Sequence, residues 1–196
     1  MKILYHEKIT VSSVFNTIVS ERKMFMKLIA AVSAEWGIGK DNKLLFSIPA
    51  DMKFFRETTK GHTVIMGRKT LESFPGGNPL KNRNNIVFSK TLKPFAGITV
   101  VRSLDELMHI PEASDNDAFV IGGESIYRLL LPYIDIALIT KVNASTPADS
   151  FLPDFDGLAD WYLAGKSDEI IDNGYSFTFC TYRRLADSER NNIRKD

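Results

Sequence analysis

Cysteine and histidine are scarce in this sequence, and their scarcity excludes two kinds of protein. The single cysteine, Cys180, cannot form an internal disulfide, so we expect no disulfide-stapled secreted domain and predict a reducing, cytoplasmic setting. It lies in an alternating run, which indicates packing within a strand. The three histidines, His6, His62 and His109, lie far from one another and from Cys180 in the sequence. Because they have no metal-ligand spacing, we predict no metal site.

The chain also lacks an excess of charge and any long apolar run. It has 25 lysines and arginines against 24 acidic residues, and a net charge of +1 gives no field of the kind that attracts nucleic acid. No apolar stretch approaches the roughly 20 residues that a bilayer-spanning helix needs. We therefore predict a soluble protein without nucleic-acid or membrane partners. A hydrophobic content of 44% is enough for one core, and we expect a monomer.

The chain divides into a leader, one domain and a tail. Residues 1–25 do not match a secretion signal, because polar residues interrupt the apolar stretch at 9–19. This leader has three alternative interpretations: an upstream start, a remnant of cloning or a short docking helix. Residues 26–185 form the predicted domain, and the polar segment 186–196 is predicted to be disordered.

Apolar runs alternate with helical segments along the domain. Strands are predicted at 27–33, 63–66, 85–88, 98–101, 118–121 and 136–142, and helices at about 49–58, from 68, at 104–109 and at 126–131. Nearly continuous apolar runs are typical of central parallel strands covered on both faces. Segments 161–166 and 175–183 instead alternate, as half-exposed strands do. We therefore predict an α/β fold with a mostly parallel central sheet, flanking helices and a C-terminal antiparallel edge hairpin.

A glycine-bearing loop at 36–42 follows the first strand. Gly37 and Gly39 imitate the start of a dinucleotide fingerprint, but Asn42 stands where the third glycine belongs and no helix begins there. We reject a Rossmann turn and predict a mobile loop over a site, because the glycines leave the backbone soft.

The helix at about 49–58 carries the carboxylate of most interest. Ser47 can cap its first amides, and Pro49 suits a first-turn position that needs no amide hydrogen. At helical spacing, Asp51 shares one face with Phe54 and Phe55. A plain alternative is that Asp51 only complements the positive end of the helix dipole.

Phosphate-suited residues follow three predicted strands. Arg68 follows the second strand, Ser89 and Lys90 follow the third, and Gly122 with Gly123 follows the strand at 118–121. In open α/β sheets, ligands bind at the carboxyl ends of strands. A solvated basic turn and tight strand-to-helix packing are the plain alternatives for the basic residues and the glycines.

Seven ordered motifs resemble one family, the dihydrofolate reductases of the bacterial, single-domain type. The motifs are Leu28-Ile-Ala-Ala, Trp36-Gly-Ile-Gly, Ile48-Pro-Ala-Asp51, Val64-Ile-Met-Gly-Arg-Lys-Thr70, Arg83-Asn-Asn-Ile-Val, Val120-Ile-Gly-Gly-Glu-Ser-Ile-Tyr127 and Phe151-Leu-Pro. The resemblance covers about residues 26–185. It implies reduction of dihydrofolate to tetrahydrofolate by hydride from NADPH, in support of one-carbon and thymidylate metabolism, with antifolates as inhibitors.

The resemblance also implies roles for individual residues. Asp51 matches the group that binds the pterin and raises the basicity of the nitrogen to be protonated. The implied catalytic residues are Asp51, Phe46 and Thr140. The implied substrate-binding residues are Ile29, Ala30, Asp51, Met52, Phe55, Ser73, Phe74, Arg83, Ile121, Tyr127 and Thr140, with Arg83 facing the glutamate tail. The implied cofactor-binding residues are Ala31, Ile38, Gly67, Arg68, Lys69, Thr70, Ser89, Lys90, Gly122, Gly123, Glu124, Ser125 and Ile126.

Three positions depart from the family pattern. Phe46 stands where the family usually has tryptophan, and it lacks the indole donor that would hold a water near the pterin. Ser125 falls where some members carry an arginine, which leaves more of the 2′-phosphate charge to Lys90. Lys81-Asn82 replaces the commoner Pro-Gly before Arg83, which alters the setting of that arginine.

Two related functions compete with this interpretation. A pyrimidine reductase of riboflavin synthesis shares the glycine pair and an NADPH site, but Ile-Pro-Ala-Asp followed by phenylalanines favours a pterin. A weakly active paralogue that binds cofactor is the second rival, which Phe46 supports and the pair of Asp51 and Thr140 opposes. A nucleic-acid-binding module is disfavoured by the near-zero net charge.

Overall fold

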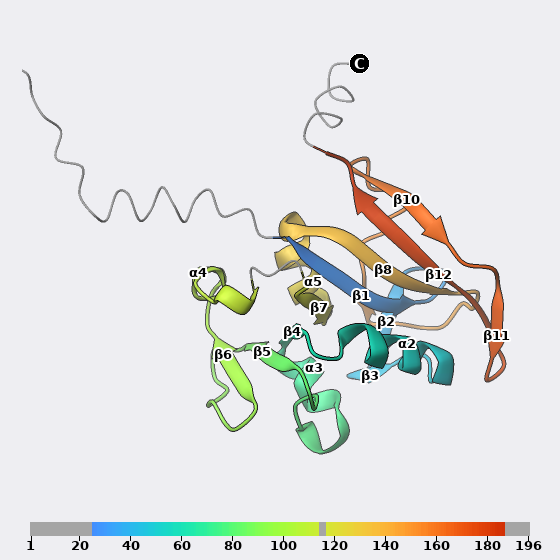
Figure 1. The fold of residues 1–196 in the computed structure, drawn as a ribbon. Coiled ribbons are helices and arrows are strands. Elements are labelled where there is room, and N and C mark those ends of the chain that lie inside the picture. Colours follow the sequence, from blue (N-terminus) through green and yellow to red (C-terminus); the bar gives the residue numbers. More distant parts are fainter. Residues whose placement is uncertain (1–24, 114–116, 187–196) are drawn as a thin grey trace, which may run out of the picture.

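The computed structural model describes residues 25–113 and 117–186 (Figure 1). Residues 1–24 of the leader and 187–196 of the tail lie outside the described residues, and so do the predictions made for them. The main sheet has nine strands in the described chain, in the order β10-β12-β8-β1-β7-β4-β5-β6, with β11 paired to β12. These strands are β1 (Met26–Val32), β4 (Thr63–Gly67), β5 (Asn84–Phe88), β6 (Ile98–Val101), β7 (Phe119–Gly122), β8 (Ile134–Val142), β10 (Trp161–Lys166), β11 (Ile170–Asp172) and β12 (Tyr175–Arg184).

The strand directions confirm the predicted α/β fold. All neighbouring pairs from β8 to β6 are parallel, whereas β12 runs antiparallel to β8 and β10 runs antiparallel to β12. The predicted edge hairpin is therefore present, and the short strand β11 adds to it. Cys180 lies in β12 and is buried, as expected for strand packing.

The two faces of the sheet bury different clusters because side chains alternate along each strand. Ile29 and Val64 belong to one cluster, which Phe54 and Phe55 of α2 cover, whereas Leu28 belongs to the cluster on the other face. The helices are α2 (Pro49–Thr59), α3 (Arg68–Ser73), α4 (Leu104–Met108) and α5 (Glu124–Leu130), with short 3-10 turns at Pro75–Gly77, Pro111–Ala113 and Leu131–Tyr133. The carboxyl ends of β8, β1, β7, β4 and β5 lie next to one another in the strand order.

The loop at 36–42, whose predicted mobility stays a prediction, contains one strand of a second, small sheet. Strand β2 (Gly37–Lys40) pairs with β3 (Lys43–Leu44) and with β9 (Ser150–Phe151). The turn between β2 and β3 has positive φ at both central residues, as in the tight turns that suit hairpins. The amide of Asp41, the first of these two residues, donates to Asp149 Oδ2 at 2.8 Å. Paired strands, which were not visible in the glycine content, therefore hold this segment.

The first turn of α2 is capped from a distant part of the chain, which corrects the prediction for Ser47. The N-cap residue is Ile48, and no side-chain cap is made by a neighbouring residue. The Ala50 amide instead donates to Asp172 Oδ2 at 2.7 Å, and Asn173 Nδ2 donates to the Ser47 carbonyl at 2.7 Å. The tight turn after β11 therefore anchors the start of the helix that carries Asp51.

Removing this remote cap is expected to destabilise the protein. Asp172→Ala should lower the free energy of unfolding by about 1 kcal/mol, because an amide at the helix start loses its acceptor. Urea unfolding measures the change. Asp168→Ala, which removes the same charge from an exposed residue nearby, is the control and should leave stability nearly unchanged. Equal effects of the two substitutions would contradict a capping role for Asp172.

Residues 25–113 and 117–186 contain neither a membrane-spanning helix nor a cluster of metal ligands. In these ranges no helix is both long and apolar enough to cross a bilayer. The same residues contain no group of three or more His, Cys, Asp or Glu side chains placed to hold a metal ion.

Candidate active site

Asp51 and Thr140 meet although they lie 89 residues apart in the sequence. The Thr140 hydroxyl donates to Asp51 Oδ1 at 2.6 Å, which joins the first turn of α2 to the central part of the sheet. Thr140 is buried, and it pairs with Ala31 of the neighbouring strand β1. The predicted pair of polar residues is thus brought together at the carboxyl end of β8.

The helix that carries this carboxylate packs against an apolar cluster. Ile29 and Ile121 are buried in the cluster that Phe55 and Phe74 pack against. Burial raises the pKa of the Asp51 carboxyl above its usual range, and the hydrogen bond from Thr140 opposes that rise. Charge on Asp51 is therefore poorly screened.

Tyr127 connects the helix α5 to this region. Its hydroxyl donates to the Ile29 carbonyl at 2.9 Å, and its ring is buried. Burial raises the pKa of the Tyr127 phenol, and the charge of Asp51 raises it further. Tyr127 therefore stays protonated and acts as a fixed donor to the backbone of β1.

Two glycine-bearing turns lie side by side next to this region. A Cβ on Gly67 would lie 3.1 Å from the side chain of Ile126, and a Cβ on Gly123 would lie 3.4 Å from the Thr70 hydroxyl. Gly122 has φ +122°, which disfavours any larger residue, and the Gly122–Gly123 peptide is cis. The start of α3 and the start of α5 therefore pack closely against each other.

The basic residues predicted for the cofactor lie at the ends of β4 and β5. These strands pair in register up to Gly67 and Phe88, so Arg68 and Ser89 follow paired positions. Arg68 also donates to Glu72 at 2.6 Å. Ser89 Oγ accepts from the amide of Leu92 at 2.9 Å, which shapes the turn around it.

Sequence reasoning missed Arg102 at this edge. Its guanidinium donates to the carbonyls of Ser89 and Leu92, and the residue is exposed directly beside the predicted 2′-phosphate site. Its place directly after β6 could have predicted this position, because β5 and β6 are parallel and end together.

Several predicted site residues lie apart from Asp51. The Arg83 side chain contacts the carboxyl end of α2, where its Nη2 donates to the Arg56 carbonyl at 2.6 Å. Phe46 packs in a separate cluster with Ile48, and its ring centre lies 5.2 Å from that of Tyr175. Ala30 and Ile38 pack against the cluster on the opposite face of the sheet. Met52, Ser73, Lys69, Lys90 and Ser125 are exposed.

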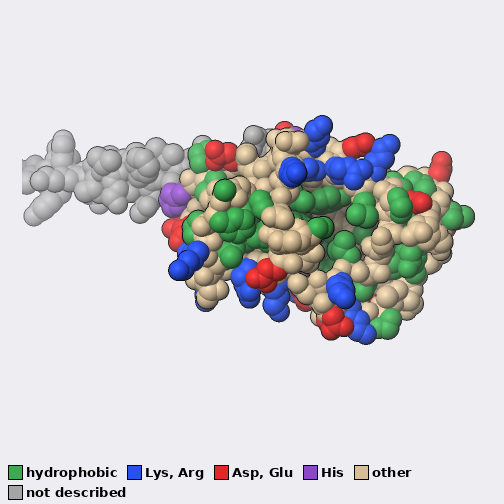
Figure 2. Space-filling view, turned by 90° about the horizontal axis from the view of Figure 1, so that it is seen from below, with side chains coloured by type: hydrophobic (Ala, Val, Ile, Leu, Met, Phe, Trp, Pro, Cys, Tyr) green, Lys and Arg blue, Asp and Glu red, His purple; other side chains and the backbone are tan. Residues whose placement is uncertain are grey.

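The surface that carries α2 and α3 has the form expected of a ligand site. Viewed from below Figure 1, hydrophobic side chains gather around a hollow, with lysine and arginine side chains at its margins (Figure 2). An apolar hollow with cationic margins suits an aromatic ligand that carries anionic groups.

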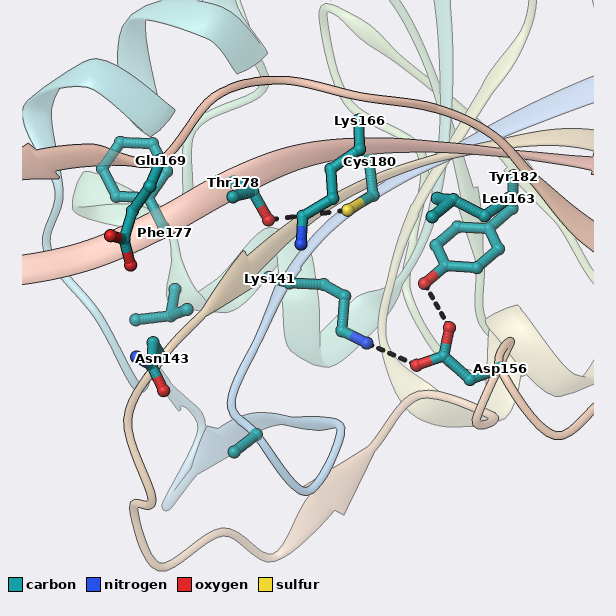
Figure 3. Close-up of a pocket in the computed structure, with 12 residues that line it drawn as sticks. Lys141, Asn143, Asp156, Leu163, Lys166, Glu169, Phe177, Thr178, Cys180 and Tyr182 are labelled. Carbon is teal, nitrogen blue, oxygen red and sulfur yellow. Dashed lines mark hydrogen bonds and ion pairs between the residues drawn. The ribbon is translucent and has the colours of Figure 1, made fainter.

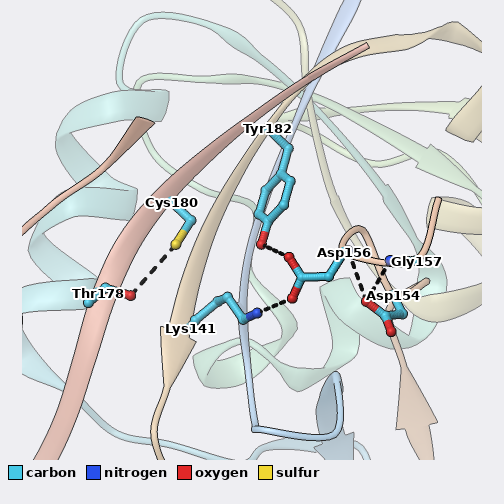
Figure 4. A network of polar contacts seen from close by, with 7 residues as sticks. All are labelled: Lys141, Asp154, Asp156, Gly157, Thr178, Cys180 and Tyr182. Atoms are coloured by element: carbon cyan, nitrogen blue, oxygen red, sulfur yellow. Dashed lines mark hydrogen bonds and ion pairs between the residues drawn. The ribbon is translucent and has the colours of Figure 1, made fainter. Parts of the chain in front are cut away.

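A groove of about 500 Å³ lies on the opposite face of the sheet (Figure 3). It is lined by Lys141, whose side chain points away from that of its neighbour Thr140 because residues alternate along β8. Lys141 bonds to Asp156, and Asp156 Oδ1 accepts from the Tyr182 hydroxyl at 2.6 Å (Figure 4). The groove contains none of the predicted site residues, and its Lys141 and Asp156 already pair with each other. We therefore place the candidate active site at Asp51 instead.

Comparison with known proteins shows the family of the chain. A family model for dihydrofolate reductase matches residues 25–184. The chain is 38% identical to the dihydrofolate reductase of Bacillus subtilis (strain 168) over 84% of this chain and 97% of that protein. It is 35% identical to dihydrofolate reductase type 3 of Salmonella typhimurium over 82% of this chain and 99% of that protein, and 33% identical to the dihydrofolate reductase of Staphylococcus haemolyticus over 82% and 96%. Since these matches span the whole predicted domain, the chain belongs to the dihydrofolate reductase family.

Proposed function

We propose that this protein reduces 7,8-dihydrofolate to 5,6,7,8-tetrahydrofolate with hydride from NADPH. The observation that carries the proposal is the half-buried carboxylate of Asp51, which accepts from Thr140 and acts on Tyr127, the residue that packs against Gly122. It is supported by membership of the dihydrofolate reductase family and by the names of the relatives. Asp51 is the ionisable group that the apolar walls surround.

Asp51 and Thr140 orient the pterin ring. The carboxylate accepts hydrogen bonds from the amidine-like edge of the ring, and its charge favours the protonated form of the nearby ring nitrogen. The apolar side chains of Ile29, Phe55 and Ile121 enclose the ring and exclude water, which strengthens this electrostatic effect. The chain thus supplies a site that favours protonation next to the carbon that receives hydride.

The residues around the two glycine turns fit a dinucleotide. At Gly122 and Gly123 the backbone approaches the Thr70 hydroxyl, and side chains in their place would crowd it. Arg68, Lys90 and Arg102 place positive charge around Ser89, which suits the 2′-phosphate that distinguishes NADPH from NADH. When bound, NADPH supplies the hydride. The protein holds its phosphates at the strand ends and places the nicotinamide by the glycine turn.

The direct test follows the loss of reduced-nicotinamide absorbance when the purified protein is mixed with NADPH and dihydrofolate. We expect oxidation that depends on dihydrofolate and is much slower with NADH at equal concentration, because NADH lacks the 2′-phosphate. The pyrimidine intermediate of riboflavin synthesis serves as the competing substrate. A folded protein that shows no dihydrofolate-dependent oxidation would refute the proposed reaction and favour the cofactor-binding paralogue.

A further inference from the structure

A buried asparagine holds the loop that leads into β5. Asn85 is 4% exposed, and its side chain faces the loop that runs from Leu80 to Arg83. Its Oδ1 accepts from the Leu80 amide at 3.0 Å, and its Nδ2 donates to the carbonyls of Leu80 at 2.9 Å and Arg83 at 3.1 Å. An asparagine amide group has two donor hydrogens and one acceptor oxygen, and here all of them bond to the backbone of one loop. Asn85 therefore closes this loop at both ends.

The residues of the loop do not fix its shape by themselves. Lys81 leaves its own φ free, whereas a proline at that position would restrict it. Asn82 has φ +59°, a left-handed conformation that asparagine adopts more readily than most residues, and its carbonyl accepts from the Gly61 amide at 2.8 Å. The shape of the loop therefore depends on bonds from residues outside it, and Asn85 makes three of these bonds.

The side chain of Arg83 is held as well as its backbone. Its Nε and Nη2 donate to Thr59 Oγ1 at 3.2 and 3.1 Å, and Thr59 is fully buried. The Thr59 hydroxyl donates to the Phe55 carbonyl at 2.8 Å, so its lone pairs are left to accept from Arg83. The guanidinium can reach this fixed acceptor only from a suitable position of the Arg83 backbone, and that position is the one that Asn85 sets.

We propose that Asn85 is a positioning residue that fixes the backbone of Arg83 and so places the guanidinium for the anionic tail of the substrate. A charge that is already in place needs no ordering when the ligand binds, so a residue that never touches the substrate contributes to its affinity. A purely structural role would instead affect every ligand of the site alike. This inference rests on the proposed function and on the assignment of the glutamate tail to Arg83.

The test compares two ligands of which only one carries the tail. KM is measured for dihydrofolate, and the inhibition constant is measured for dihydrobiopterin, a dihydropterin without the benzoylglutamate group. Asn85→Leu keeps the approximate size of the side chain and removes its three bonds. We expect it to raise KM for dihydrofolate about fivefold, as for residues that share one hydrogen-bond network, with kcat and the inhibition constant within about twofold of wild type. Asn84→Ala, at the exposed neighbouring position, is the matched control and should change none of these values.

A double substitution shows whether Asn85 acts through Arg83. In the Arg83→Ala background, Asn85→Leu should add no further rise in KM, because no guanidinium is left to position. A further rise as large as in the wild-type background overturns the inference, and so does an equal rise in KM and in the inhibition constant.

Urea unfolding of every variant checks the fold, and Asn85→Ala is the second variant if leucine is not accommodated. Loss of the fold in both variants would assign Asn85 to folding alone and would also overturn the inference. If the wild type reduces dihydrofolate and Asn85→Leu leaves KM unchanged, the inference alone fails. Failure of the wild type to reduce dihydrofolate overturns the proposed function instead.

Discussion

Asp51→Asn is expected to lower kcat/KM for dihydrofolate about 10²- to 10⁴-fold at neutral pH, the range typical of lost proton-transfer catalysis. The carboxylate lies among apolar side chains and accepts from Thr140, so asparagine can keep the hydrogen bond while the charge is lost. Without that charge, nothing in the described site favours the protonated pterin. The expected loss is therefore in the chemical step, with a smaller change in substrate affinity.

The pH profile separates this role from simple binding. The residual rate of Asp51→Asn should rise as pH falls, because substrate then arrives already protonated from solvent. The control is Glu57→Gln, on the exposed side of the same helix, which should keep the wild-type rate and profile. A residual rate of the Asn variant that does not change with pH would count against Asp51 as the promoter of protonation.

The same substitution is expected to make the free protein more stable at neutral pH. Burial raises the pKa of Asp51 in the folded state, so the folded protein binds this proton more tightly than the unfolded chain does. The stabilising contribution is present below the ordinary carboxyl pKa and is lost as pH rises through the raised value. Asparagine carries no charge to bury, so urea unfolding should show a gain over wild type at pH 7 that shrinks at acid pH. A variant less stable than wild type at pH 7 would contradict this account.

Arg83→Lys is expected to raise KM for dihydrofolate about 10- to 100-fold, the effect of losing one hydrogen-bonded charge contact, with little change in kcat. The guanidinium donates to the Arg56 carbonyl, to Thr59 Oγ1 at 3.1 Å and to the Lys81 carbonyl at 2.8 Å. These bonds orient its planar fork before the substrate arrives, and a lysine ammonium cannot reproduce that geometry. A contact to the glutamate tail is made equally in ground and transition states, so its loss affects KM.

Arg56→Ala distinguishes an oriented contact from general positive charge. Burial is the main cause that lowers the pKa of Arg83, and the charge of its exposed neighbour Arg56 lowers it further. Its removal should change KM by less than about threefold, since exposed charges are well screened. Steady-state kinetics of both variants at moderate salt give the comparison. Equal increases in KM for the two variants would mean that general positive charge binds the glutamate tail, and would contradict a specific role for Arg83.

The element types and the fold class were already visible in the sequence, because they depend on local patterns. Buried strands such as β4 read as continuous apolar runs, and the helix face that joins Asp51 to Phe54 and Phe55 follows from the helical period. Because the central strands are parallel, their carboxyl ends lie at the same edge of the sheet. The alternative that Asp51 only complements a helix dipole is weakened by its bond to Thr140.

Only the tertiary structure decided which distant residues meet. The cap of α2 comes from Asp172 instead of Ser47, and part of the glycine-bearing loop forms β2, which pairs with β9. Arg102 joins the cofactor edge because β5 and β6 end together, although nothing near Ser89 in the sequence indicates it. Local patterns specify the conformation of a segment and the face it buries. Hydrogen bonds between segments more than 100 residues apart depend on the register of the whole sheet, which no local pattern contains.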